Sequence, residues 1–152
     1  MKKIFCLFIV CVLFASIVPF AGQAAENDKV ENIFYLSDGS YIIVEVTASL
    51  ARASGTVTGT KTYTCKTEDG TALWRAVLTG KFSYTGSSAS CTSSSCSVTI
   101  YDSAWYTVSK TATKNGNTAT ASVTMGKKML GVTVRKVPIT INLVCDANGN
   151  IS

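Results

Sequence analysis

The chain of 152 residues contains no histidine, and this absence removes much of the catalytic repertoire. The Ser-His-Asp and Cys-His mechanisms need an imidazole as general base, and histidine-based zinc hydrolysis needs it as a ligand. Cysteine pairs at CxxC spacing are absent as well, so a structural zinc site is not predicted. No recognisable serine-nucleophile motif replaces these groups. We therefore expect no cofactor and no catalytic metal.

Proline and helical periodicity are almost missing. Only Pro19 and Pro138 occur, and no segment sustains an apolar repeat of 3.6 residues. Apolar stretches are short, with a single exception over residues 4–20, so no other segment is predicted to span a membrane. The chain is therefore expected to contain little helix.

The one long apolar stretch is typical of a signal peptide. Met1-Lys2-Lys3 forms a cationic start, residues 4–20 are apolar, and small residues lead up to Ala24. We expect cleavage after Ala24 and a secreted protein. A retained membrane anchor is the alternative, although a run of about 17 residues is short for a bilayer span. The predicted organisation is a signal peptide (1–24), a flexible leader (25–32) and one domain (33–152).

Alternation of apolar and polar residues dominates the remainder. In residues 74–84 the even positions are apolar or glycine, while most odd positions are polar, as in a strand with one buried face. Turn chemistry separates such segments at Asp38-Gly39, Asp69-Gly70 and Asn115-Gly116. We expect an all-β fold, an antiparallel β-sandwich of about eight or nine strands with an immunoglobulin-like topology as one option. The expected strands lie near 33–36, 41–48, 57–66, 72–85, 97–101, 105–111, 118–125, 129–136 and 138–145, with a Ser-rich loop over 86–97.

Four cysteines follow the predicted cleavage site, namely Cys65, Cys91, Cys96 and Cys145. An even number in an exported chain indicates disulfides, and four cysteines allow three connectivities. Cys145 ends an apolar strand face and should be buried. Cys91–Cys145 with Cys65–Cys96 is one solution, and a local Cys91–Cys96 bridge is its rival.

Carboxylates are the remaining route to catalysis, because two-carboxylate glycoside hydrolysis needs no histidine. Glu68 and Asp69 belong to a predicted turn, and Asp102 is expected to bond nearby backbone at a strand end. Only Glu45 lies within a predicted strand, on its wetter face. Residues 146–150 look like part of a calcium loop, but the glycine spacing differs from the EF-hand pattern and a turn is expected.

Positive charge is concentrated in the second half of the chain. Residues 71–152 hold 8 basic and 2 acidic side chains, a balance that favours anionic partners. Two basic pairs, Lys127-Lys128 and Arg135-Lys136, bracket residues 129–134. If this ribbon projects, its cations could contact an anionic cell-wall polymer or lipid headgroups. Nucleic acid is not expected, because four charges without an accompanying motif are too few. A solvated hairpin is the simpler interpretation.

An aromatic cluster, formed by Tyr101, Trp105 and Tyr106, lies beside a predicted turn. Exposed aromatic rings stack on sugars or anchor a surface protein, whereas buried ones complete a sandwich core. Whether Trp105 and Tyr106 are exposed decides between these two interpretations.

The order of several short motifs resembles a family of small secreted proteins of unknown function from Gram-positive, clostridia-like bacteria. The motifs include DGSY (38–41), GTALW (70–74), GKFSY (80–84), YDSAW (101–105) and KNGNTAT (114–120). The resemblance covers residues 35–152 and implies location and size class but no activity. It also implies pairing of Cys91 with Cys145, while Cys65 and Cys96 depart from the family pattern.

Taken together, the sequence predicts a secreted, non-catalytic binding or structural protein at or near the cell envelope. A secreted carboxylate-dependent hydrolase and a small exported toxin are the alternatives.

Overall fold

The computed structural model describes residues 27–48 and 55–152, so the predicted signal peptide and cleavage site lie outside the described residues. The fold is all-β, as the sequence predicts, with two antiparallel sheets. The strands are β1 (Asn27–Tyr35), β2 (Tyr41–Ala48), β3 (Gly55–Lys66), β4 (Ala72–Tyr84), β5 (Ala89–Ile100), β6 (Trp105–Asn115), β7 (Thr118–Met129) and β8 (Val132–Val144).

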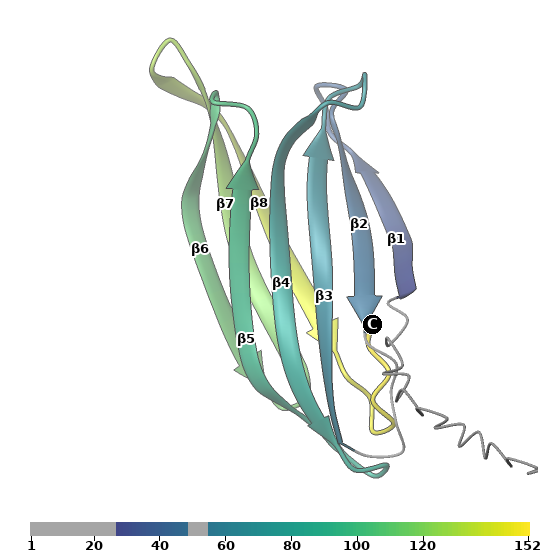
Figure 1. Cartoon of the computed structure of the whole chain (residues 1–152). Coiled ribbons are helices and arrows are strands. Elements are labelled where there is room, and N and C mark those ends of the chain that lie inside the picture. The colour runs from purple at the N-terminus through teal and green to yellow at the C-terminus, as the bar shows by residue number, and fades with distance from the viewer. Residues whose placement is uncertain (1–26, 49–54) are drawn as a thin grey trace, which may run out of the picture.

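Within each sheet the strands follow their order in the chain. One sheet has the order β1-β2-β3-β4-β5 and the other β6-β7-β8. Figure 1 shows the sheets as two layers, with the chain passing from one to the other between β5 and β6. An immunoglobulin domain needs Greek-key crossovers between its sheets. That optional topology was therefore wrong, and the observed arrangement is a pair of meanders.

The core lies between the layers and confirms the predicted alternation. The even-numbered residues of β4 from Trp74 to Tyr84 are buried, while Arg75 and Lys81 are exposed. The largest fully buried side chains of the first sheet include Trp74, Leu78 and Phe82. Those of the second sheet are Met125, Val123, Ile141 and Leu143. Burial of these apolar surfaces on one face of each sheet is what holds the layers together.

Two strand predictions needed correction. The Ser-rich segment expected as a loop is most of β5, because β4 is long enough to pair with it from Trp74 to Tyr84. The two strands expected at 129–136 and 138–145 are one strand, β8, which continues through Pro138. Proline is tolerated there because β8 is an edge strand and has one side without ladder bonds.

The first strand begins earlier than the sequence suggested. β1 starts at Asn27, within the segment expected as a flexible leader, and pairs with β2 from Asn27 opposite Ala48. Regular β-structure is therefore present from residue 27, before the domain start expected at residue 33.

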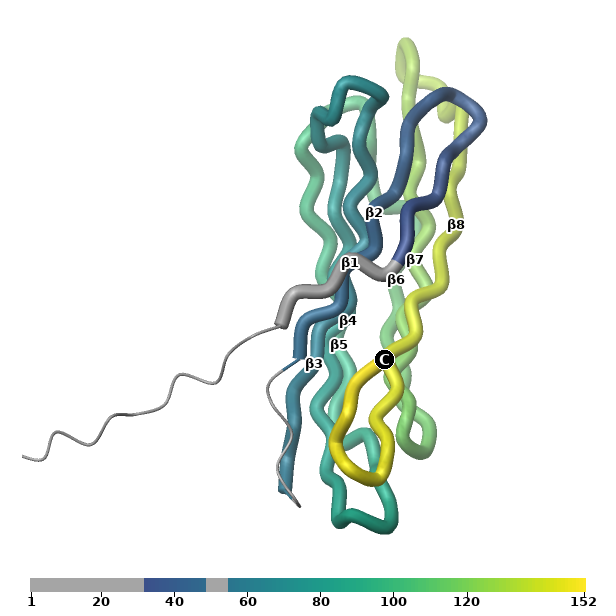
Figure 2. The backbone as a smooth tube through the Cα atoms, turned by 90° about the vertical axis from the view of Figure 1, so that its right-hand side faces the viewer, coloured from purple at the N-terminus to yellow at the C-terminus, as the bar shows by residue number. Residues whose placement is uncertain are grey.

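The loops fall at two ends of the sandwich. The β1–β2, β3–β4, β5–β6 and β7–β8 connections share one end, which we call the hairpin end (Figure 1). At the opposite end, the chain after β8 folds back so that Ile151 bridges Cys145 and packs near Gly59. Gly149 lies against the Tyr84 ring, where a side chain would not fit. Figure 2 shows this terminal loop beside the β4–β5 turn.

Candidate functional site

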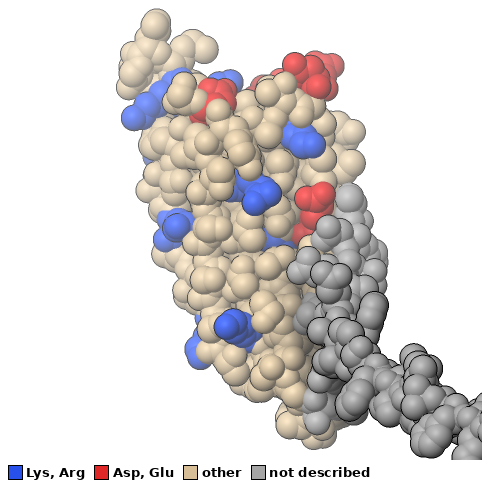
Figure 3. All heavy atoms as spheres, in the orientation of Figure 1, with Lys and Arg blue, Asp and Glu red and all other residues tan. Residues whose placement is uncertain are grey.

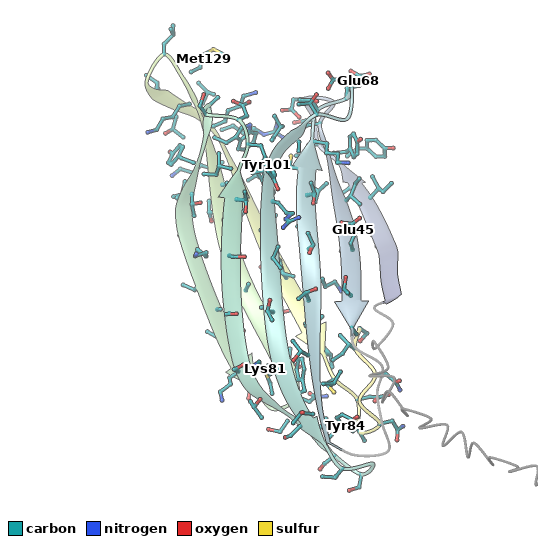
Figure 4. The ribbon with its side chains drawn as sticks, in the orientation of Figure 1. Glu45, Glu68, Lys81, Tyr84, Tyr101 and Met129 are labelled. Atoms are coloured by element: carbon teal, nitrogen blue, oxygen red, sulfur yellow. The ribbon has the colours of Figure 1, made fainter. Side chains whose placement is uncertain are left out.

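The β7–β8 hairpin extends beyond the rest of the sandwich. β6 begins at Trp105, which lies opposite Lys127, and the Lys128 N–H donates to the Ala104 carbonyl at 2.7 Å. Past this point β7 and β8 have no third strand, so residues 129–134 form a free two-stranded ribbon. Figure 4 shows Met129 at its tip, well separated from Glu68 on another loop of the same end.

The tip is a two-residue turn with an unusual occupant. Met129 pairs with Val132, and the residues between them, Leu130 and Gly131, have φ of 50° and 81°. Positive φ at both central positions is the type I′ geometry, for which Asn-Gly is preferred. Leu130 is the only non-glycine residue with positive φ in the described part of the chain. Its side chain is 100% exposed.

The apolar character continues down the ribbon from the turn as far as Val134. Lys127 pairs with Arg135 and Lys128 with Thr133, which leaves Val134 as the extra residue of a β-bulge. A bulge bends the strand and changes the direction of its side chains. Val132 is 65% exposed, Val134 53% and Met129 61%. We call residues 129–134 the apolar tip.

The four basic residues predicted as a binding surface have different environments. Lys136 and Lys128 are exposed, and the Lys128 Nζ lies 4.4 Å from the centre of the Tyr106 ring. Lys127 faces the inner side, with its Nζ 5.8 Å from the Trp105 ring centre. In the described residues no carboxylate forms an ion pair with any of these three lysines. They form a collar of positive charge directly below the apolar tip, and we call them the lysine collar.

Arg135, the fourth basic residue, is committed to the fold. Its guanidinium forms an ion pair with the Asp38 carboxylate in the β1–β2 turn. Partial burial raises the pKa of Asp38, but hydrogen bonds from Ser40 and from Arg135 outweigh that effect, and the pKa falls from 3.8 to about 2. Arg135 therefore joins the two sheets, and we remove it from the candidate binding surface.

The predicted aromatic cluster is divided among three environments. Trp105 is buried and packs on Trp74, with 6.0 Å between ring centroids. Tyr106 lies on the outer face of β6, over Gly126, and its hydroxyl bonds the Thr133 hydroxyl at 2.6 Å. Tyr101 is 52% exposed in the β5–β6 connection. The three rings do not form one sugar-binding surface. Trp105 completes the core, and Tyr106 braces the base of the β7–β8 hairpin.

Figure 3 shows how charge is distributed over one face of the molecule. Lys and Arg lie just below the uncharged projection at upper left, which is the β7–β8 hairpin, with an acidic group beside them, and other acidic groups lie on the loops at upper right. The two charge types share the hairpin end but lie on different connections. This separation places the lysine collar and the apolar tip together, away from most of the acidic groups.

The candidate catalytic carboxylates are not brought together. Glu45 lies in β2, and its neighbours on the same face are Ile43, Thr47 and the cross-strand Thr62. The predicted turn at Glu68-Asp69-Gly70 is confirmed by the bond from Gly70 N–H to the Thr67 carbonyl. Asp102 accepts the Ala104 N–H at 2.9 Å, as predicted. No group of three or more cysteine or acidic residues in the described chain is arranged to hold a metal ion.

The segment compared with a calcium loop is a turn. The Asp146 carboxylate accepts backbone N–H groups of Asn148 and Asn150 at 2.8 Å and 2.9 Å. It also accepts the Asn150 side-chain amide at 2.7 Å, and these hydrogen bonds lower the pKa of Asp146. The carboxylate is thus occupied by its own loop.

All four cysteines of the described chain are free thiols, so none of the predicted disulfides is formed. Cys65 pairs with Trp74, and Trp74 pairs with Ile100, which lies four residues from Cys96 on β5. Two strand spacings and four residues separate the Cα atoms of Cys65 and Cys96 by about 16 Å, too far for a disulfide. Cys91 and Cys96 lie five residues apart on one extended strand, about 16 Å, which excludes the local bridge as well.

Cys91 and Cys145, in contrast, flank a single turn. The Cys91 N–H donates to the Gly116 carbonyl at 2.7 Å, and the Cys145 N–H donates to the next carbonyl, that of Asn117, at 3.1 Å. Both are buried, which raises the pKa of each thiol; Asp146 and then Cys91 raise that of Cys145 further. The cysteines are therefore close in space although 54 residues apart in sequence.

The sequence shows the two basic pairs and allows a projecting hairpin between them, but it does not predict that the apolar residues of this hairpin are exposed. The alternation over residues 129–136 predicts a strand with one buried face, whereas Val132 and Val134 are both exposed. The available signal was Leu130-Gly131, whose glycine marks the turn and whose leucine then has to be exposed.

No model of a known family, no curated protein and no solved structure matches the chain. The resemblance to small secreted proteins thus stays a prediction. The described residues contain no helix of the length and hydropathy needed to cross a bilayer.

Proposed function

We propose that the protein is an exported, non-catalytic binding protein that attaches to anionic surfaces of the cell envelope through its β7–β8 hairpin. Support for export comes from the signal-peptide pattern, and support for binding comes from the lysine collar. The carrying observation is that Lys127, Lys128 and Lys136 surround the base of a projecting hairpin with no described carboxylate paired to them.

Three positively charged side chains are concentrated at the base of the β7–β8 hairpin. The lysines lie at the base of a ribbon whose tip extends beyond the neighbouring loops (Figure 1), so a surface contacted by the tip is also near the lysines. Each lysine near such a surface contributes about 1 kcal/mol at physiological ionic strength. Because these contacts are exposed, added salt should weaken them.

Retention of the chain from residue 25 on an anionic polymer resin tests the proposal. The double variant Lys128→Glu/Lys136→Glu should lose at least about tenfold in affinity, and the loss should shrink as salt is added. Arg75→Glu/Lys81→Glu is the matched control, because both side chains are exposed on β4 and the net charge changes equally. Equal retention of the two variants would refute the assignment of the hairpin.

Export also bears on the cysteines. In an oxidising compartment, neighbouring thiols are converted to a disulfide. Cys91 and Cys145 are such neighbours, because their N–H groups donate to the adjacent carbonyls of Gly116 and Asn117. This bridge is part of the proposal for the exported form, and it would fix the far end of the sandwich from the hairpin.

A carboxylate-dependent hydrolase finds less support. On β2 and β3 the neighbours of Glu45 are hydroxyl and aliphatic residues and include no second acid, whereas glycoside hydrolysis needs two carboxylates within about 10 Å. A screen on glycans and peptides, with Glu45→Gln as the inactive control, tests this second candidate.

A further inference from the structure

We propose that the apolar tip inserts into the interfacial region of a lipid bilayer that carries anionic headgroups. This inference rests on the proposed function, because the lysine collar makes the first contact with the surface. It goes further by naming lipid, rather than a water-dissolved polymer, as the material that the tip contacts.

The first argument is that Leu130 does nothing for the fold. Its side chain is 100% exposed, so it buries no apolar surface within the molecule. Its φ of 50° is disfavoured for a leucine, whereas asparagine or glycine would adopt it readily. A strained, exposed residue at the extreme of a projecting turn points to a role outside the molecule.

The second argument is the size and continuity of the apolar surface. Met129, Leu130 and Val132 surround the turn, and Val134 continues it on β8, each more than half exposed. Scattered surface leucines and valines are ordinary, but a contiguous apolar group on a protrusion marks a contact with a partner or a membrane.

The third argument is the order of groups along the hairpin. Lys128 lies two residues from Leu130, a rise of about 7 Å along an extended strand. Interfacial segments bury their apolar side chains about 5–10 Å into the boundary between headgroups and acyl chains. With the tip at that depth, the lysine collar lies at the level of the phosphates. A soluble anionic polymer would use the cations but leave Leu130 without a contact.

The base of the hairpin is also fixed to the sandwich, so the apolar tip is held in a projecting position. Tyr106 packs over Gly126, bonds Thr133 and lies under Lys128, so the base of the ribbon is fixed on its outer face. On the inner face, Arg135 is held by Asp38. Figure 2 shows the β1–β2 hairpin next to β8 at this end.

The test uses co-sedimentation of the chain from residue 25 with vesicles of phosphatidylcholine, alone and mixed with phosphatidylglycerol. Leu130→Asn should lower the partition coefficient on the mixed vesicles by about tenfold, since one leucine side chain no longer enters the bilayer. The same variant should keep its retention on the anionic polymer resin. Its melting temperature should rise by a few degrees, because Asn-Gly suits the turn better. Val108→Asn, at an exposed site on β6, is the matched control and should leave partitioning unchanged.

A second variant reports insertion directly. Trp74 and Trp105 are 0% and 2% exposed, so their emission should not respond to vesicles. Leu130→Trp should therefore show a blue shift on mixed vesicles that the unsubstituted chain lacks. Equal partitioning of Leu130→Asn and the unsubstituted chain, or an unshifted Leu130→Trp, would overturn the inference. So would an equal loss of Leu130→Asn binding on lipid-free cell walls, which would assign the tip to a wall component.

The two proposals fail separately. Loss of the Lys128 and Lys136 effect on the polymer resin removes the proposed function. An intact lysine effect with no Leu130 effect on vesicles removes only the insertion.

Discussion

The carboxylate of Asp38, in the β1–β2 turn, forms an ion pair with the guanidinium of Arg135, on β8 of the opposite sheet. In the part of the chain that the structure describes, no strand of the first sheet pairs with β8, so at the hairpin end this ion pair adds to the β5–β6 connection and the packing of side chains in holding the sheets together. The pair also distinguishes Arg135, a structural cation, from the lysine collar, whose members flank it in the chain.

The ion pair should make the free energy of unfolding decrease at acidic pH. The pKa of Asp38 is about 2 in the folded protein and 3.8 ordinarily, so the carboxylate stabilises the fold above pH 3.8 and loses this effect as pH falls towards 2. After allowance for its partial exposure, the contribution is about 1 kcal/mol. Urea unfolding at about pH 6 and about pH 3 should show a smaller difference for Asp38→Asn than for the unsubstituted chain. Identical differences would contradict the assignment.

Arg135→Gln should weaken the fold and leave surface binding intact. Loss of the guanidinium leaves Asp38 without its partner, at a cost of about 1 kcal/mol in the free energy of unfolding. A double-mutant cycle with Asp38→Asn, measured by urea unfolding, should give a coupling energy of similar size. Retention on the anionic resin should stay close to that of the unsubstituted chain, unlike the large loss expected for Lys128→Glu/Lys136→Glu. A large loss of retention would return Arg135 to the binding surface.

Oxidation should link Cys91 to Cys145 and leave Cys65 reduced. Cys65 is fully buried, its pKa is raised to about 11 by burial, and none of the other cysteines in residues 27–48 and 55–152 lies within reach. After incubation with oxidised glutathione, peptide mass spectrometry should find one internal disulfide, at a gain of about 2–4 kcal/mol in stability. Cys91→Ser should abolish that gain, with Cys96→Ser as the control that keeps it. A bridge involving Cys65 would refute the described register.

Gly126 should tolerate no side chain while Tyr106 is present. A Cβ at Gly126 would lie 2.6 Å from atoms of the Tyr106 ring, so Gly126→Ala has to displace the ring and its bond to Thr133. We expect a loss of about 1–3 kcal/mol in unfolding free energy. In a Tyr106→Ala background the same substitution should cost much less, and additive effects would argue against the contact.

Local pattern was sufficient to predict the strands whose two faces differ strongly. β4 is the best example, since Trp74, Leu78 and Phe82 alternate with polar residues and leave one possible orientation. The sequence predicts only the end of β5, because Ser94 and Cys96 on its inner face look little different from the serines on its outer face. Only the pairing with β4, a long-range feature, identifies it as a strand.

In the candidate site, too, features of single residues could be predicted and features that depend on distant partners could not. The basic pairs around residues 129–134 were visible because charge is a property of single residues. The roles of Arg135 and Tyr106 were not, because each depends on a partner far away in the sequence, Asp38 in one case and Thr133 in the other. The β-bulge at Val134 could not be predicted either, since it arises from the offset of two strands.

Between the described strands, the chain passes from one layer to the other through the short connection from β5 to β6. This connection joins the two sheets along one side of the sandwich, and β1 and β8 are the edge strands on the opposite side. Fluctuations that separate the two sheets should begin on the side opposite the β5–β6 connection. Amide protons of β8 should therefore exchange with solvent before those of β4 and β7. The β7–β8 hairpin, which we propose contacts the surface, therefore includes the edge strand expected to open first.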